Sequence, residues 1–340
     1  MSDQQPTKKT DDQVEDDQVV KNTEDGDEED DLTTGQSLCM LGVIVCGRAM
    51  MSLPLSSLYL AFDMATHFAL HFMIAGGACL AGFFMPKWNL RTAIVLTIAG
   101  VIGIGYVAKQ APYATAKIST PANTKALKLM TYNSWLTNHN WQGIVEEIKA
   151  KDPDIVTILE ISHEKTKLMD ALAKTYPYRV DCREVHYCHA AVLSKFPFAQ
   201  QKIQTRWNGP PYIHVTYGKE LSGLNVFAVH TIRPPYYNAH WRQIVALSKR
   251  VEAVKGLRVV MGDFNSTPFS RTLNKFGDYT NLKRITAKPT WPAHVGNLPQ
   301  VAIDHIFISP EIKVLKKHFL GNSVGSDHFP VNAVVSVPIN

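Results

Sequence analysis

The sequence predicts an α/β fold built from mixed β-sheets over residues 125–340, and three observations lead to this prediction. Short apolar runs of strand length alternate with segments in which apolar residues recur at helical spacing. Six of the apolar runs begin or end on polar residues. Four of these polar stops follow their strands and two stand at or before the start. All six can share one rim only if some strands run antiparallel, which implies mixed sheets.

The strands and helices follow in order along this region. Apolar residues from Trp141 to Ile148 recur at helical spacing, and Pro153 marks the end of that segment. Tyr178–Cys182 and Ala190–Ser194 are close enough in sequence to form a hairpin. The predicted strands are Leu127–Tyr132, Asp154–Leu159, Tyr178–Cys182, Ala190–Ser194, Tyr212–Tyr217, Leu224–Val229, Leu257–Met261 and Val301–Ser309. The other predicted helices are Glu164–Lys174 and Ala239–Val254.

Charge divides the chain into unlike parts. Residues 1–37 carry 13 acidic and 3 basic residues, a net charge of −10, and we expect a disordered acidic tail there. Residues 109–340 carry 29 basic and 16 acidic residues, a net charge of +13. A basic globular domain favours anionic partners, although such charge can also serve solubility alone. Residues 109–124 are rich in Ala, Pro, Ser and Thr and are predicted to be a linker.

Residues 38–108 form an apolar region that predicts two or three transmembrane helices. Met64–Met85 and Thr92–Ala108 carry no formal charge, whereas Leu38–Phe62 is a weaker candidate because of Arg48 and Pro54. A buried helical hairpin is the alternative. The intervening loop contains Lys87 and Arg91, so the positive-inside rule places that loop in the cytoplasm. We therefore expect an integral protein of the inner or plasma membrane with its globular domain outside the cytoplasm.

The six polar stops predict one site assembled from distant segments. They are Asn133, Glu160, His230, Gly262-Asp263-Phe264-Asn265, Asp304-His305 and Ser326-Asp327-His328. In this order they resemble the endonuclease/exonuclease/phosphatase superfamily over roughly residues 127–337. The resemblance implies a four-layer sandwich of two mixed β-sheets flanked by helices. It also implies a metal-dependent phosphoric ester hydrolase that uses Mg²⁺ or Mn²⁺.

The resemblance also implies a role for each residue. A carboxylate at a strand end suits a hard cation, so Glu160 is the first predicted metal ligand. Asn133 can add its carbonyl oxygen as a ligand or hold a metal-bound water, and Asp327 is either a second ligand or a support. His328 is the predicted general base, and Asp304 fixes its tautomer. Asp263 is placed to orient or activate water, and Asn265 and His230 can donate to the phosphate. The family's mechanistic schemes differ on which group takes the proton. His305 is expected to point to the opposite face of its strand. Arg206 and Trp291 are candidates for contact with the substrate.

Three functions remain open at this stage. The predicted function is that of a membrane-anchored nuclease that hydrolyses nucleic acid outside the cytoplasm, because the domain is basic. Two alternatives are kept beside it. The predicted membrane helices favour the same hydrolysis of a phospholipid, sphingomyelin or inositol phosphate head group. The third possibility is a catalytically inactive membrane scaffold that uses the fold for binding, which the complete set of site residues argues against.

The cysteines allow two interpretations in the globular domain. Cys182 and Cys188 flank the turn of the predicted hairpin, so they can face each other and form a disulfide outside the cytoplasm. Together with His186 and His189 they can also be interpreted as zinc ligands, although the spacing is not a usual one.

Overall fold

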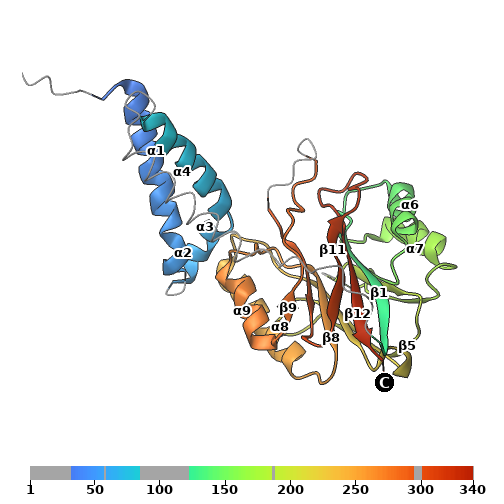
Figure 1. Cartoon of the computed structure of the whole chain (residues 1–340). Helices are drawn as coiled ribbons and strands as arrows, with labels where there is room; N and C mark the ends of the chain where they lie inside the picture. The colour runs from blue at the N-terminus through green and yellow to red at the C-terminus, as the bar shows by residue number, and fades with distance from the viewer. Residues whose placement is uncertain (1–31, 57–58, 85–121, 186–187, 295–300, 340) are drawn as a thin grey trace, which may run out of the picture.

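The structure is a computed structural model, and it describes residues 32–56, 59–84, 122–185, 188–294 and 301–339. It consists of an N-terminal helical region and a larger β-sheet domain, which lie side by side (Figure 1). The acidic tail up to residue 31, the predicted span Thr92–Ala108 and most of the predicted linker fall outside the described residues.

The domain contains two mixed sheets of six strands each, as predicted. Strands β1 and β2 are parallel, as are β7 and β8, and their other neighbours are antiparallel. In sheet order the first sheet contains β11 (Lys313–Leu320), β12 (Val331–Pro338), β1 (Thr124–Asn133), β2 (Ile155–Leu159), β4 (Ala190–Ser194) and β3 (Tyr178–Asp181). The second contains β5 (Phe198–Gln204), β6 (Tyr212–Tyr217), β7 (Asn225–His230), β8 (Arg258–Asp263), β10 (Asp304–Ile308) and β9 (Lys283–Arg284).

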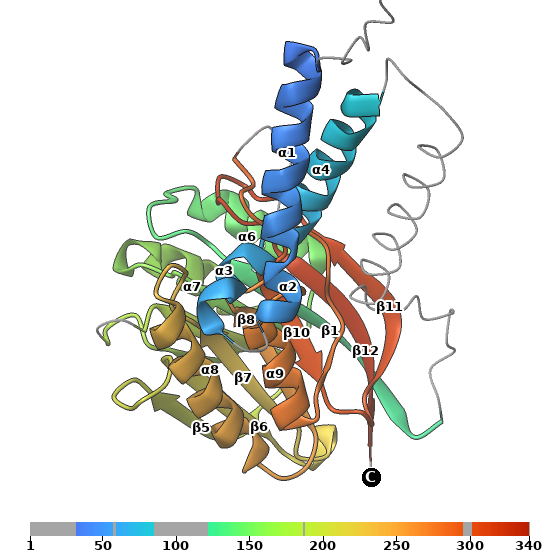
Figure 2. The same ribbon diagram turned by 90° about the vertical axis from the view of Figure 1, so that its left-hand side faces the viewer.

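Helices cover the outer face of each sheet and complete four layers (Figures 1 and 2). The first sheet carries α6 (Trp141–Lys151) and α7 (Thr166–Leu172), and the second carries α8 (Tyr237–Glu252) and α9 (Arg271–Thr280). Three apolar clusters fill the spaces, one between the sheets and one under each helical layer. Each central strand is therefore buried on both faces, because successive side chains point to opposite sides. The remaining turns are η3 (His163–Lys165) and η4 (Lys219–Leu221).

The structure decides between the two interpretations of the cysteines and adds elements that the sequence did not predict. Cys182 and Cys188 form a disulfide across the turn between β3 and β4, so both thiols are used and the zinc interpretation is wrong. Strands β5, β9, β11 and β12 and helix α9 were not predicted. Strand β5 is largely exposed and carries polar residues, so it gives no clear sequence signal. Helix α9 buries Leu273 and Phe276 on one face, and this helical spacing was not used in the prediction.

The helical region is a hairpin of α1 (Thr34–Met50) and α4 (Ala69–Phe84), joined by α2 (Ser52–Leu55), η1 (Leu60–Phe62) and α3 (Asp63–Thr66). Each cysteine of this region packs against a glycine of the opposite helix. A Cβ atom added to Gly42 would lie 2.5 Å from Cys79 Sγ, and one added to Gly82 would lie 2.9 Å from Cys39 Sγ. The two helices therefore approach closely because these glycines have no side chain.

The hairpin corrects the expectation of continuous spans over Leu38–Phe62 and Met64–Met85. Helices α1 and α4 have 17 and 16 residues, and in the described part of the chain no helix is both long and apolar enough to cross a membrane. Within the predicted span Leu38–Phe62, helix α1 ends at Met50. The predicted span Met64–Met85 begins in α3 and turns before α4, because the connecting residues contact the β-sheet domain rather than extend either helix.

Candidate active site

The strand register brings the polar stops together at one edge of the sandwich. His230 on β7 is aligned with Asp263 on β8, and Asp263 is aligned with Asp304 on β10. In the other sheet Asn133 pairs with Leu159, the residue before Glu160. A cavity of about 660 Å³ opens at this edge. Seven predicted site residues line it, namely Glu160, His230, Asp263, Asn265, Trp291, Asp327 and His328.

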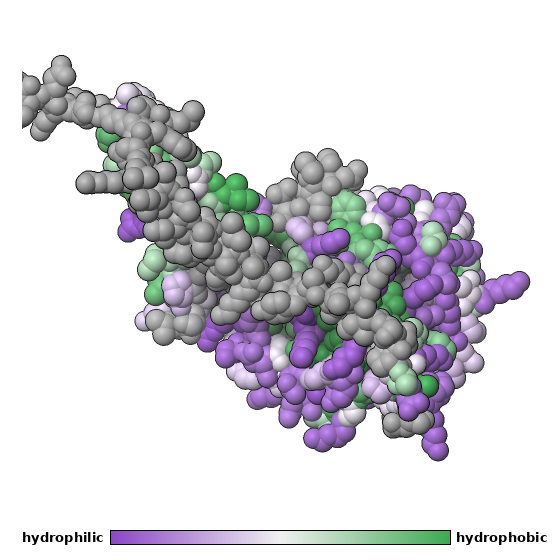
Figure 3. Space-filling model, viewed as in Figure 1, coloured by the Kyte–Doolittle hydropathy of each residue, from purple (hydrophilic) through white to green (hydrophobic). Residues whose placement is uncertain are grey.

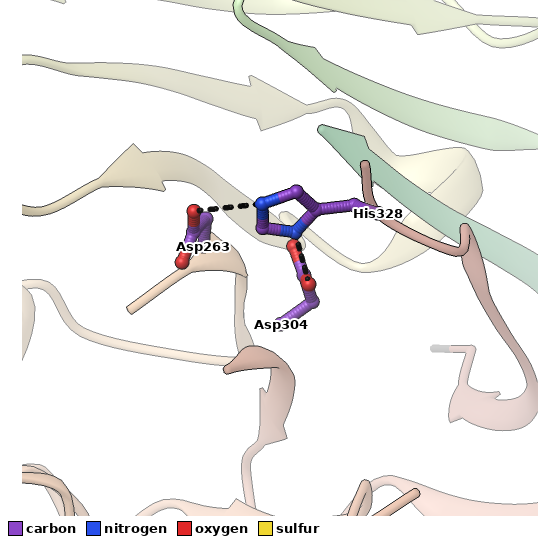
Figure 4. Close-up of side chains that lie close together, drawn as sticks. All are labelled: Asp263, Asp304 and His328. Atoms are coloured by element: carbon purple, nitrogen blue, oxygen red, sulfur yellow. Dashed lines mark hydrogen bonds and ion pairs between the residues drawn. The ribbon is translucent and has the colours of Figure 1, made fainter. Parts of the chain in front are cut away.

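His328 and Asp304 form a buried pair. His328 Nδ1 lies 2.8 Å from Asp304 Oδ2, and His328 Nε2 lies 3.9 Å from Asp263 Oδ2 (Figure 4). The hydroxyl of Thr290 donates to the same Asp304 oxygen at 2.6 Å. The carboxylate thereby fixes the orientation of the imidazole and presents Nε2 to the cavity, as an orienting acid does in a catalytic dyad.

The charges around this pair shift the pKa values of two groups. Burial alone would lower the pKa of His328, but Asp304, Asp263 and Asp327 outweigh it and raise the pKa to about 10. Burial, together with the neighbouring Asp304, raises the pKa of Asp263 to about 6. At neutral pH His328 is therefore a cation and Asp263 an ionised carboxylate. The pKa of His328 therefore lies above the neutral range expected from the sequence, because three carboxylates surround it.

Glu160 stands just beyond β2 in a left-handed conformation, with φ of 53°. Asn133 Nδ2 donates to Glu160 Oε1 at 3.0 Å and to Asp263 Oδ2 at 3.1 Å, and the backbone N–H of Leu136 donates to Glu160 Oε2. Burial would raise the pKa of Glu160, but His230 and these hydrogen bonds hold it below its usual value. Asn133 thus orients two carboxylates with its amide nitrogen.

Lys165 supports this loop and was not predicted as a site residue. Its buried ammonium donates to the backbone oxygens of Ser134, Trp135 and Glu160, and burial lowers its pKa to about 8. These three bonds tie the segment after β1 to the segment after β2, so Lys165 determines where the Glu160 carboxylate lies. A lone lysine in a predicted helix carries no sequence signal for such a role.

The Gly-Asp-Phe-Asn motif needs its glycine because two backbones meet there. Gly262 has φ of 152°, and a Cβ atom would lie 1.9 Å from the carbonyl oxygen of Val229 on β7. Asn265 also has positive φ, and its side-chain amide donates to Thr231 O at 2.9 Å. One amide hydrogen of Asn265 remains for a ligand in the cavity. His230 Nε2 lies 3.6 Å from Asp263 Oδ2.

The donors around the cavity fit a hard divalent cation. Asp327 has one carboxylate oxygen bonded to Trp291 Nε1 at 3.1 Å, whereas its other oxygen is buried without a hydrogen bond. His328 Nε2 lies 4.0 Å from this oxygen, too far for a hydrogen bond, and supplies part of the positive charge that a buried carboxylate needs. Glu160, Asp263 and Asp327 offer the carboxylate oxygens that Mg²⁺ and Mn²⁺ prefer. Asp263, Asp304 and His328 could also hold an ion, since their ligand atoms lie within 4.8 Å of one another.

Three other residues complete the comparison with the sequence. Arg206 is exposed and does not line the cavity, whereas Trp291 does. His305 points away from the cavity as expected, with Nε2 2.8 Å from Ser266 O. The cavity also has a wall that sequence reasoning missed, formed by Met64, His67 and Phe68 of the helical region. The apolar character of that stretch indicated a membrane span and gave no sign of a role in the site.

Comparisons with known proteins agree with this architecture. The model of the endonuclease/exonuclease/phosphatase family matches residues 130–328. No curated protein matches the chain. A structure of TDP2 from D. rerio, solved with a single-strand DNA product, is 14% identical, covers 62% of this chain and 99% of its own, and has a TM-score of 0.53.

Two further solved structures cover similar shares of this chain. A family protein from Bacteroides thetaiotaomicron is 16% identical, with 63% of this chain and 98% of that chain covered and a TM-score of 0.50. Sphingomyelinase C from Streptomyces griseocarneus is also 16% identical, with 63% and 100% covered and a TM-score of 0.47. At these identities the likeness concerns the fold. Together with the family match over residues 130–328, the two-sheet sandwich and the convergence of its polar strand ends identify the chain as a member of the endonuclease/exonuclease/phosphatase family.

Proposed function

We propose that this chain hydrolyses phosphodiesters with the help of Mg²⁺ or Mn²⁺. The observation that carries the proposal is the buried His328–Asp304 pair, which shares one cavity with the carboxylates of Glu160 and Asp263. Phosphodiester hydrolysis needs a base for water, a positive charge on the phosphate oxygens and relief of charge on the leaving oxygen. This cavity offers a group for each task.

Glu160 and Asp327 are the residues that would hold the cation, with Asp263 beside them. When bound, a divalent cation acts as a Lewis acid on a non-bridging phosphate oxygen. Asn133 keeps the Glu160 carboxylate oriented through the 3.0 Å hydrogen bond to Oε1. It therefore supports the ligand, in place of the direct carbonyl ligation that the sequence left open.

The remaining residues divide the proton transfers and the charge stabilisation. Asp263 takes a proton from the attacking water, since it is ionised at neutral pH and faces the cavity. His328, held as a cation by Asp304, gives its Nε2 proton to the leaving ester oxygen, which departs as the neutral alcohol. Asn265 and His230 donate further hydrogen bonds to the phosphate. The sequence favoured His328 as the base and also allowed Asp263 to activate the water, and the two pKa values support Asp263 as the base.

The substrate class that the cavity favours is a phosphodiester with an apolar group, such as a lipid head group at a membrane surface. Much of the lining is apolar, and Arg233 is its one lysine or arginine among the described residues. The helical hairpin next to the cavity exposes large apolar side chains (Figure 3), namely Leu38, Met40, Leu41, Ile44, Val45 and Ile74. Such a surface suits contact with lipid.

Nucleic acid is the second candidate, because residues 109–340 carry a net charge of +13. A basic surface attracts a polyanion from any direction and gives binding that weakens steeply with salt. The cavity itself adds little to this attraction. The two candidates share the same reaction and the same site residues, so they differ only in what lies beyond the reacting phosphate.

We further propose that the helical region holds the chain at the inner or plasma membrane, with the sandwich outside the cytoplasm. The exposed apolar side chains of α1 and α4 favour attachment to a membrane. The Cys182–Cys188 disulfide favours a location in an oxidising compartment. A reporter that is active only outside the cytoplasm, fused after Asn340, should be active. Activity of a cytoplasm-specific reporter at that position would contradict this orientation.

The decisive experiment is a hydrolysis panel with the full chain in detergent and Mg²⁺. The substrates are bis(p-nitrophenyl) phosphate, single- and double-stranded DNA, RNA, and vesicles that contain sphingomyelin or phosphoinositides. We expect hydrolysis of bis(p-nitrophenyl) phosphate and of a vesicle lipid, abolished by Glu160→Gln. Cleavage of nucleic acid alone, with a steep fall as salt rises, would favour the second candidate. If the chain hydrolyses none of them, it is the binding scaffold that the sequence left open.

A further inference from the structure

The segment Asp63–Phe68 docks on the sandwich through a buried carboxylate. The oxygens of Asp63 accept hydrogen bonds from four donors at the start of α9. These are the hydroxyls of Ser270 at 2.9 Å and Thr272 at 2.5 Å, and the backbone N–H groups of Arg271 at 2.6 Å and Thr272 at 3.2 Å. The first N–H groups of a helix have no partner within it and carry partial positive charge, so a carboxylate is stabilised there.

Two further hydrogen bonds extend this contact. The backbone N–H of Thr267 donates to His67 Nδ1 at 3.2 Å, and Arg271 Nη1 donates to the carbonyl oxygen of Ser56 at 2.9 Å. Thr267 lies two residues after Asn265, in the loop that leads from the Gly-Asp-Phe-Asn motif to α9. The docked segment therefore holds the same loop that carries Asn265 into the cavity.

The docked segment also faces the reacting groups. Met64, His67 and Phe68 line the cavity that contains Glu160 and His328. Because the Thr267 N–H occupies Nδ1, neutral His67 carries its proton on Nε2, which leaves an N–H donor for a ligand. Burial lowers the pKa of His67 to about 4, so the ring is neutral at physiological pH. A neutral donor flanked by two apolar side chains suits an uncharged oxygen next to an apolar group.

We propose that Asp63–Phe68 is a substrate-binding part of the active site. Asp63 is a positioning residue that docks the segment, Met64 and Phe68 contact an apolar substituent of the phosphodiester, and His67 Nε2 donates a hydrogen bond to one of its ester oxygens. This inference rests on the proposed phosphodiesterase activity and goes beyond it, since it assigns part of the specificity to a region outside the catalytic domain. An isolated sandwich would lack this wall.

The docking is tested first, without reference to activity. Hydrogen exchange of the Thr267, Arg271 and Thr272 amides is measured in the full chain and in Asp63→Asn, which replaces one of the two accepting oxygens by an NH₂ group. The matched control is Asp278→Asn, which removes an exposed carboxylate from the same helix. We expect faster exchange of these amides in Asp63→Asn only. Unchanged exchange in that variant would overturn the docking role of Asp63.

Substrate contact is tested with two soluble esters that share a leaving group. Bis(p-nitrophenyl) phosphate carries a second aryl group, and methyl p-nitrophenyl phosphate does not. We expect His67→Ala to raise KM about tenfold for both esters with a small change in kcat, as the loss of one neutral hydrogen bond predicts. Phe68→Ser should raise KM for the bis-aryl ester alone. His163→Ala, at an exposed histidine, is the control and should change neither constant.

The outcomes separate this inference from the proposed function. Equal KM values in wild type, His67→Ala and Phe68→Ser would contradict substrate binding by Asp63–Phe68, while the assignment as a hydrolase would stand. Higher activity in Asp63→Asn would also contradict such binding, because the segment would then obstruct the site. If the wild type hydrolyses neither ester, the proposed function fails. Dissociation constants of both esters, measured by calorimetry on wild type and His67→Ala, then still decide whether His67 contacts the ligand.

Discussion

The two-sheet sandwich and the helical hairpin bury their apolar residues to very different extents. The central strands of the sandwich are enclosed on both faces by three apolar clusters. In the hairpin, Cys46 and Ala69 are the only buried apolar side chains among its described residues, whereas at least six large ones on α1 and α4 are exposed. Both regions are rich in apolar residues, so composition alone does not distinguish them.

This difference in burial suits the two regions to different functions. The sandwich can hold buried charges such as Asp263 and Asp304 at fixed positions, because dense packing on both sides prevents the strands from moving. The hairpin holds one buried carboxylate, Asp63, and uses it to attach itself to the sandwich. We therefore expect changes in the sandwich to affect the chemistry, and changes in the hairpin to affect membrane contact and substrate binding.

The largest expected effect is in the sandwich, at Glu160. Glu160→Gln keeps the shape of the side chain but removes the charge that a divalent cation requires. We expect kcat to fall by about a thousandfold, because several kcal/mol of charge stabilisation is lost. Excess chelator should abolish the wild-type rate. The exposed neighbour Glu164 provides the control variant Glu164→Gln. A wild-type rate that persists in chelator would exclude the metal mechanism.

The His328–Asp304 pair comes next. His328→Ala and Asp304→Asn should each lower kcat by about 10²- to 10⁴-fold, as expected for a positioned acid or base. The double variant should be little worse than either single one, because the two side chains act as a unit through their 2.8 Å contact. Rate measurements on the three variants check this. Losses that multiply in the double variant would mean that the residues act independently.

Changes in the hairpin should weaken binding to membranes and leave kcat unchanged. The triple variant Leu41→Gln, Ile44→Gln and Ile74→Gln replaces exposed apolar side chains. We expect at least about a tenfold loss of partition into vesicles, since each side chain contributes roughly 1 kcal/mol. The kcat for a soluble ester should not change. Ile203→Gln, at an exposed position of β5, is the control. A lower kcat in the triple variant would contradict the view that the sandwich alone carries the chemistry and the hairpin the membrane contact.

The smallest effect is the release of the docked segment by acid. The pKa of His67 is lowered from 6.5 to about 4, mainly by burial, with Asp63 raising and His240 lowering it. A histidine with a lowered folded pKa stabilises the docked state fully above pH 6.5 and loses that contribution as pH falls toward 4. The protection of the Thr267 amide, measured as its exchange rate relative to the intrinsic rate at each pH, should therefore fall over this interval. His67→Leu should remove this pH dependence, and an unchanged dependence in that variant would assign it to other groups.

Much of the sandwich and its site was predictable because the relevant signals are local. Every predicted strand corresponds to an observed one, since a buried strand needs a short apolar run. The polar stops marked six residues that line the cavity, because a charged residue that ends a buried run has to face a rim. Edge strand β5 and helix α9 were missed, since their stability comes from pairing and packing with distant segments.

Tertiary contacts determined what no local pattern encodes. The residue types of the pair were visible in the sequence, but the protonation of His328 depends on Asp263 and Asp304 from two other strands as well as on its neighbour Asp327. The apolar stretch around Met64 has the composition of a membrane helix, and only the hydrogen bonds between Asp63 and α9 turn it into a wall of the cavity. Burial and charge depend on neighbours that lie 200 residues away along the chain, so their effects emerge only once the chain is folded.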